Sequence, residues 1–210
     1  MGLDAFTCAR STVISKTILG RADPRGVITR NGASVHDDIY VSGTIGDSAA
    51  GLKIIKEPVN YLADSDQLYL KDRYYLPRPR VKLGMGLVGV ASAAMDVSDG
   101  LIQDLEHLCS ASNLGAIINW PMLPLSKPVE HLLGKKTIPI SLIAHGGDDY
   151  ELLFTAPKRL RAKVEDIAKA SDVVVTRIGH TINGSDVRLL DETNSSINLI
   201  GAGFKHDQIV

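Results

Sequence analysis

A short apolar strand that leads directly into an acidic loop and then into an amphipathic helix is the feature that most restricts the fold. The strand is expected at residues 92–95, and the loop at residues 96–100 has the sequence DVSDG. In the following helix, Leu101, Leu105 and Leu108 fall at positions i, i+4 and i+7, which places them on one face. This segment predicts a domain of mixed α and β structure with polar groups at a strand-to-helix junction.

The order of the other expected elements is irregular. Strands are expected at residues 11–19, 38–43, 92–95, 115–120, 151–155 and 173–178, with a hairpin formed by residues 187–190 and 197–200. Helices are expected at residues 49–56, 64–75, 80–90, 129–133 and 158–170, and directly after residue 100. This order favours an α+β fold, with a mixed sheet packed with helices, over a regular βαβ winding.

The first expected strand, residues 11–19, has no earlier element to pair with. A strand with unpaired edges is a template for further pairing. We therefore expect this strand to pair with another copy of the chain, to dock elsewhere or to be mobile.

Composition and charge exclude several classes of protein. The 210 residues are 44% hydrophobic, enough for a core, and the net charge of −1 gives no broad positive surface for nucleic acid or anionic lipid. No apolar run reaches the roughly 18–20 residues of a membrane span, and the first residues lack a signal peptide. We expect a cytoplasmic protein with no nucleic-acid or membrane partner. Cys8 and Cys109 are expected to be reduced thiols.

The DVSDG loop is the first place where chemistry is indicated. Asp96 and Asp99 offer oxygen ligands that suit a hard cation such as Mg²⁺, and the free N–H groups at the start of the next helix suit a phosphate. An ordinary helix N-cap is the alternative interpretation. An N-cap alone does not account for the second aspartate, Asp96, at the end of the strand.

Two further loops combine glycine with acidic residues. Residues 146–151, GGDDYE, place three acids within four positions, which indicates either a polar loop that enters a strand or a general acid, base or substrate acceptor. Residues 43–48, GTIGDS, do not match a P-loop and are better explained as a tight turn in which Asp47 or Ser48 caps a helix.

Other candidates are weaker. The six histidines show no zinc-binding spacing, and His145, which precedes the GGDDYE loop, is the one that deserves notice. Arg78 and Arg80 lie between prolines and fit an anion site or an exposed basic turn equally well. No serine lies in a G-x-S-x-G elbow. The residues alone are compatible with Mg²⁺-phosphate chemistry but do not require it.

Taken together, five segments resemble thiamine-monophosphate kinases. They are GASVHDDIYVSGTIGDSAAGL (32–52), PRPRVKLG (77–84), AMDVSDGLIQDLEHLC (94–109), LPLS (123–126) and GGDDYELLFT (146–155). That family shares its fold with aminoimidazole ribonucleotide synthetase and selenophosphate synthetase, whose members have an N-terminal α/β domain that forms a dimer barrel and a C-terminal α+β domain. The resemblance covers residues 10–204. It implies that residues 1–30 are the remnant of the N-terminal ATP-binding domain and that residues 31–210 are the C-terminal domain.

The resemblance also implies a reaction, the transfer of the γ-phosphate of ATP to thiamine monophosphate to give thiamine diphosphate, with several Mg²⁺ ions. Such transfer depends on positioning and charge neutralisation more than on covalent catalysis, so no catalytic residue is assigned. The residues implied by motif position are Asp96 and Asp99 for Mg²⁺, Arg30 and Ser98 for ATP, and Asp148 and Phe204 for the substrate.

This chain departs from the family at its beginning. Family members are longer, and their N-terminal domain carries most of the metal-binding aspartates; alignment back from Arg10 puts Thr7 where the family has one of them. We therefore expect the chain alone to lack kinase activity, and a homodimer is compatible with the family. The alternatives are another ATP-using member of the same fold group and a degenerate, non-catalytic binding module.

Overall fold

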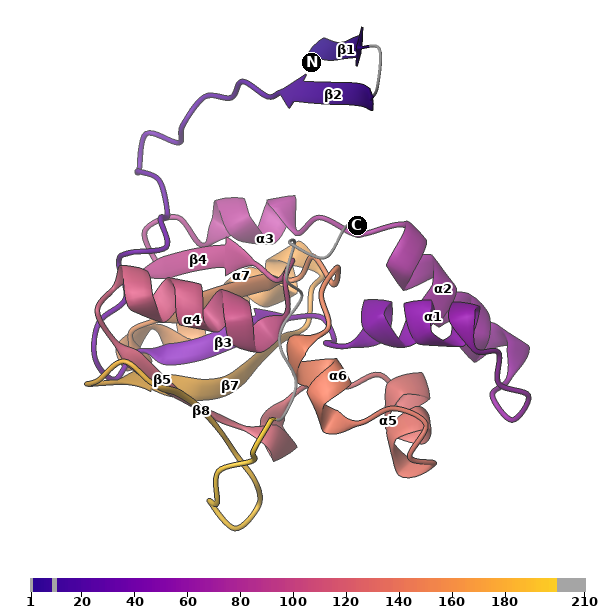
Figure 1. Ribbon diagram of the computed structural model, residues 1–210. Helices are drawn as coiled ribbons and strands as arrows, with labels where there is room; N and C mark the ends of the chain where they lie inside the picture. Colours follow the sequence, from indigo (N-terminus) through magenta and orange to yellow (C-terminus); the bar gives the residue numbers. More distant parts are fainter. Residues whose placement is uncertain (1, 9–10, 200–210) are drawn as a thin grey trace.

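The computed structural model describes residues 2–8 and 11–199 (Figure 1). The chain begins with a two-stranded antiparallel sheet of β1 (Gly2–Cys8) and β2 (Ser11–Thr17), in which Cys8 lies opposite Ser11. The strand expected at residues 11–19 was predicted to have no partner within the chain, and this prediction is wrong. Residues 2–8 form an antiparallel partner for it, which needs only a short connection. Figure 1 places the hairpin apart from the main body, to which residues 18–28 connect it.

The main body is built on one six-stranded sheet with the order β4-β6-β3-β7-β5-β8. Its strands are β3 (Asp38–Ser42), β4 (Ala93–Asp96), β5 (Gly115–Asn119), β6 (Leu152–Ala156), β7 (Val175–Ile182) and β8 (Val187–Leu190). Every neighbouring pair is antiparallel except β5 and β8, which are parallel. The predicted α+β class with a mixed sheet is confirmed.

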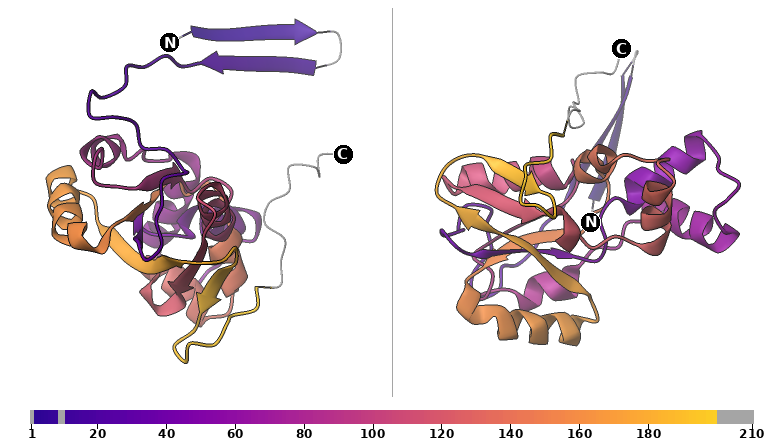
Figure 2. Two further views of the ribbon diagram at one scale, coloured as in Figure 1. Left: turned by 90° about the vertical axis from the view of Figure 1, so that its left-hand side faces the viewer. Right: turned by 90° about the horizontal axis from the view of Figure 1, so that it is seen from below.

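Helices cover both faces of this sheet and extend beyond one end of it. The helices are α1 (Asp47–Lys56), α2 (Asp64–Tyr75), α3 (Val81–Gly86), α4 (Leu101–Ala111), α5 (Lys127–Gly134), α6 (Ile140–His145) and α7 (Arg161–Ser171). Figure 2 shows α4 on one side of the sheet and α7 on the other, while α1, α2, α5 and α6 gather at one end in Figure 1. None of the helices in the described residues is long and apolar enough to cross a bilayer.

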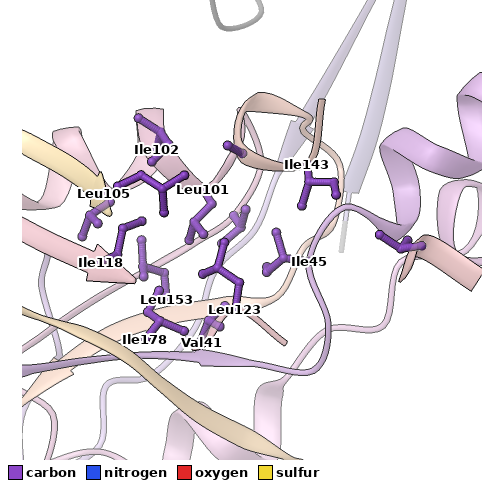
Figure 3. Close-up of a cluster of buried hydrophobic side chains, with 14 of the residues drawn as sticks. Val41, Ile45, Leu101, Ile102, Leu105, Ile118, Leu123, Ile143, Leu153 and Ile178 are labelled. Carbon is purple, nitrogen blue, oxygen red and sulfur yellow. The ribbon is translucent and has the colours of Figure 1, made fainter. Parts of the chain in front are cut away.

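The period-2 alternation of the strands divides the core into two parts. Ile39, Val41 and Leu153 point to the face covered by α4 and belong to the larger cluster, part of which is drawn in Figure 3. Tyr40 and Phe154 point to the opposite face, where their rings stack with centroids 5.1 Å apart beside α3 and α7. Strands β3 and β6 are therefore buried on both faces, which explains why β6, with the sequence LLFTA, is mostly apolar.

Three expected elements differ in the structure. Helix α3 ends at Gly86 instead of residue 90, because this stretch is rich in glycine and the φ of Gly89 is +80°. Helix α6 forms within the region expected to be irregular. The expected hairpin is reduced to a bridge between Leu190 and Ser196 and a hydrogen bond from the N–H of Ile197 to the carbonyl of Leu189, while β8 pairs with β5. Residue 200 lies outside the described residues.

Cys109 is a free, buried thiol on α4, and burial raises its pKa to about 11. A thiol with so high a pKa is almost entirely protonated near neutral pH and a poor nucleophile. Cys109 is therefore part of the core. The side chain of Cys8 lies outside the described part of the chain.

Candidate functional site

The two acidic loops and the start of α1 surround one cavity of about 580 Å³ at the end of the sheet where the extra helices gather. Its lining includes Ser48, Ser98, Asp99, His145, Asp148 and Tyr150. The structure thus brings together three of the predicted site residues, Ser98, Asp99 and Asp148. A cavity of this size suits a small organic ligand.

Backbone hydrogen bonds fasten the two acidic loops to each other. The N–H of Asp148 donates to the carbonyl of Ser98 at 2.9 Å, and the N–H of Tyr150 donates to the carbonyl of Val97 at 2.8 Å. Gly147 lies so close that an added Cβ would be 2.3 Å from the Ser98 carbonyl oxygen. Gly147 is therefore required by this close approach of two backbones.

Asp104, on the first turn of α4, occupies the N–H groups of the DVSDG loop. Its Oδ2 accepts from the N–H groups of Ser98, Asp99 and Gly100 at 2.9, 3.1 and 3.2 Å. Burial raises the pKa of Asp104, although these three hydrogen bonds act in the opposite direction. Among the N–H groups at the start of α4 that were expected to suit a phosphate, that of the N-cap Gly100 is already bound by a carboxylate of the same helix.

The start of α1 is capped by a residue about one hundred positions away. The helix N-cap is Gly46, with φ +85°, and neither Asp47 nor Ser48 caps it as expected. Instead, Asp149 accepts from the N–H of Gly46 at 2.7 Å and from the N–H of Ser48 at 3.1 Å. Asp149 is fully buried, and this burial raises its pKa to about 7. One buried side chain thus ties the GGDDYE loop to α1.

A buried group of ion pairs supports the loop from behind. Arg73 donates from Nη2 to Glu151 Oε1 at 2.8 Å, and Arg80 donates from Nε to Glu151 Oε2 at 2.6 Å. Arg73 also lies 3.6 Å from the carboxylate of Asp47. Arg80 is therefore neither an anion site nor an exposed turn, since it neutralises an internal carboxylate; its neighbour Arg78 pairs with an acid of α2 on the surface.

The GGDDYE loop alternates between exposed and buried side chains. Asp148 and Tyr150 are exposed at the cavity, whereas Asp149 and Glu151 are buried. Asp148 and Tyr150 also have positive φ angles of +66° and +50°, an arrangement that costs about 1–3 kcal/mol for each non-glycine residue. The anchored acids hold this strained backbone, so the loop presents Asp148 and Tyr150 in fixed positions.

The carboxylates of both loops raise the pKa of Tyr150. Desolvation raises the pKa of Tyr150, and the negative charges of Asp148, Asp96 and Asp99 raise it further. Asp96 lines a neighbouring cavity of about 370 Å³ that Tyr150 also lines. The three predicted carboxylates thus lie around Tyr150, which separates two adjoining spaces.

Arg30, one of the predicted site residues, does not join this group. Arg30 is exposed, and its carbonyl accepts from Ser112, which follows the last turn of α4. The cavity lies at the other end of that helix, roughly 16 Å away along eleven residues. Phe204 lies outside the described residues.

The acidic residues present fit part of a Mg²⁺ site. In residues 2–8 and 11–199, no group of three or more histidine, cysteine, aspartate or glutamate side chains is placed to hold a metal ion. Mg²⁺, however, is usually bound by one or two carboxylates together with water and substrate phosphates. Asp96 and Asp99 supply such a pair at the two ends of one short loop.

The fold and the acidic cavity together define a class of protein. Residues 34–192 match the family described as AIR synthase related protein, C-terminal domain, and the chain belongs to this family. Within it, the chain is similar to thiamine-monophosphate kinases: to that of Haemophilus influenzae, with 39% identity over 79% of this chain and 50% of the relative, and to that of Escherichia coli K12, with 36% identity over 90% and 56%. The chain spans about half the length of these relatives.

Solved structures give the same result. The thiamine-monophosphate kinase from Stenotrophomonas maltophilia K279a has a TM-score of 0.71 and 38% identity over 77% of this chain and 52% of its own. The structure described as AaThiL complexed with AMPPCP and TMP has a TM-score of 0.70 and 32% identity over 85% of this chain and 54% of its own. The predicted resemblance to the C-terminal part of these kinases is confirmed.

Sequence reasoning did not single out Arg73 or Asp104, and it marked Asp149 and Glu151 only as acids of the GGDDYE loop, without the structural roles by which they hold the site together. Arg73 lies on α2, a helix whose sequence is mostly polar, so nothing in its pattern marks it as buried. Asp104 had one available signal, an acid in the first turn of a helix that follows a glycine. The partners of Asp149 and Glu151 are too distant in sequence for local rules to find.

Proposed function

We propose that this chain carries the C-terminal part of an active site that transfers the γ-phosphate of ATP to thiamine monophosphate, giving thiamine diphosphate. The observation that supports this most directly is the joining of two acidic loops, residues 96–100 and 146–151, around one cavity. The similar protein solved with AMPPCP and TMP, at a TM-score of 0.70, supports the same ligands for this fold.

In this proposal, Asp96 and Asp99 bind Mg²⁺, which when bound neutralises negative charge on the phosphates. Ser98 contacts ATP through its hydroxyl, since its backbone is fixed on both sides by Asp104 and Asp148. Asp148 contacts the acceptor from its rigid, strained position. These residues orient the two phosphates for in-line transfer, and no side chain forms a covalent intermediate.

The proposal also includes Arg30 as an ATP contact and Phe204 as a residue that packs on the substrate. Both rest on the sequence resemblance alone. For Arg30, the position beside the far end of α4 gives no support.

We further propose that the 210-residue chain has no kinase activity by itself. Two carboxylates of one loop are a small part of a site for several metal ions, and the described residues supply no larger group. The test is to incubate the purified chain with Mg-ATP and thiamine monophosphate and to measure thiamine diphosphate. Turnover would contradict this part of the proposal.

Ligand binding tests the function itself. Titration calorimetry is expected to show that the chain binds thiamine monophosphate and that Asp148→Asn weakens this binding about tenfold, because a charged hydrogen-bond acceptor is lost. Asp186→Asn, at an exposed position near β8, is the matched control and should bind as the wild type does. Unchanged binding by Asp148→Asn would remove Asp148 from the substrate site.

The same measurement separates the alternatives. Binding of aminoimidazole precursors in place of thiamine phosphates would favour another ATP-using member of the fold group. Absence of binding to any of these ligands, or to ATP, would favour a non-catalytic module. The proposed reaction is expected to take place in the cytoplasm, and light scattering would show whether the free edges of β1 and β2 support a homodimer.

A further inference from the structure

Buried polar atoms without partners gather at one wall of the 580 Å³ cavity. Ser48 is completely buried, and its Oγ has no hydrogen-bond partner among the described residues. His145 lines the same cavity, and both of its ring nitrogens are likewise buried and without a partner there. Buried polar groups in proteins are nearly always hydrogen-bonded, so these three atoms are available to bond a polar group that enters the cavity.

The two residues are held rigidly and close together. The N–H of Ser48 is bound by Asp149 at the start of α1, and His145 is the last residue of α6. The ends of these helices are in contact: a Cβ added to Gly146 would lie 2.4 Å from the Cβ of Ala49. The hydroxyl and the imidazole are therefore preorganised to receive a ligand.

Four other side chains of the cavity wall suit a flat ring. Leu52 and Leu142 are apolar, and Tyr74 and Tyr150 add two aromatic side chains. A heteroaromatic ring packs its faces against such side chains and directs its nitrogen atoms outward in its own plane. Asp148 lies at the same cavity and next to the DVSDG loop, so a phosphate attached to the ring can reach the acidic loops.

We propose that Ser48 and His145 recognise a 4-aminopyrimidine ring. This inference rests on the proposed function, because both thiamine and the adenine of ATP contain that ring. Its ring nitrogens accept and its amino group donates, while a hydroxyl and a neutral imidazole can each donate and accept. Ser48 and His145 are thus residues that determine which ring the site accepts.

The test uses titration calorimetry on the full 210-residue chain with thiamine monophosphate, with thiamine and with Mg-AMPPCP. Ser48→Ala and His145→Leu are expected to weaken binding of a ring-bearing ligand by roughly fivefold to a hundredfold, and His145→Gln should restore most of it. Ser110→Ala and His107→Leu, the same changes at exposed positions on α4, are the matched controls and should bind as the wild type does.

Thermal unfolding without ligand separates recognition from a structural role. Because Ser48 Oγ and the His145 nitrogens have no partner in the described structure, Ser48→Ala and His145→Leu should leave the Tm unchanged or raise it. A lowered Tm together with weakened binding would mean that these side chains support the fold, and the inference would be wrong.

Comparison of the three ligands shows whether the recognised ring belongs to thiamine or to the nucleotide. Weakened binding of both thiamine compounds but not of Mg-AMPPCP assigns the pair to the phosphate acceptor, and the reverse assigns it to the nucleotide; each result supports recognition of the ring. If the wild type binds these ligands and both variants bind them equally well, the inference is overturned while the proposed function stands. If the wild type binds none of them, the proposed function fails, and the inference fails with it.

Discussion

Asp149 lies between two cavity residues, Asp148 and Tyr150, whose backbone is left-handed, and its own side chain is turned inward to α1. The neighbouring side chains therefore have different roles: those of Asp148 and Tyr150 face the cavity, and that of Asp149 holds the loop. The sequence identified Asp148 through a motif, but it gave no sign that Asp149 caps a helix. That role depends on where a loop one hundred residues away comes to lie.

The buried carboxyl of Asp149 should make the stability of the fold depend on pH. Burial raises its pKa from the ordinary 3.8 to about 7, so between these values the folded protein holds a proton that the unfolded chain releases. The free energy of unfolding should therefore fall as pH rises from about 4 to about 7, by on the order of a few kcal/mol.

Asp149→Asn removes the ionisable group and should flatten this dependence. Urea unfolding at several pH values between 4 and 7 measures it, with Asp186→Asn as the exposed control. If Asp149→Asn and wild type show parallel curves, the carboxyl of Asp149 does not carry this proton.

At the scale of elements, periodicity was sufficient where a helix or strand packs along its whole length. Helix α4 and strands β3 and β6 occur within a few residues of their predicted ranges, since their apolar positions face a core. Prediction was poorer where the pairing of a strand depends on which other elements lie beside it. β8 pairs with β5 in parallel instead of completing a hairpin, a choice that depends on the edge offered by the sheet.

The junction between β4 and α4 depends on Asp104, which binds three loop N–H groups. Asp104→Ala leaves all three without their acceptor and should lower the free energy of unfolding by about 1–3 kcal/mol. Glu106→Ala, an exposed change on the same helix, should cost less than about 0.5 kcal/mol. Chemical denaturation of both variants gives the comparison. Equal losses would show that Asp104 does not stabilise the loop.

At the scale of the whole molecule, the helices beyond the end of the sheet need a connection to it. Glu151, at the start of β6, supplies one by pairing with Arg73 of α2 and with Arg80 before α3. The sequence predicted the α+β class and two of the loops, because motifs and periodicity are local. It did not predict this connection, because the paired residues are more than seventy positions apart.

Glu151→Gln therefore tests how much this connection contributes to the stability of the fold. The change removes the carboxylate that buried Arg73 binds at 2.8 Å and leaves it, among carboxylates, only the longer 3.6 Å pair with Asp47, so it should destabilise the fold by about 1–3 kcal/mol. Glu165→Gln, an exposed position on α7, should have little effect. Thermal unfolding of the two variants measures the difference, and similar Tm values would show that this ion pair is not required.

The in-and-out alternation of residues 148–151 has a consequence for how such a protein can change over generations. The side chains that line the cavity are not the ones that hold the loop in place. Substitutions at 148 and 150 can therefore alter what the site accepts while 149 and 151 preserve its shape. A loop of this design lets new specificity arise without a matching loss of foldability.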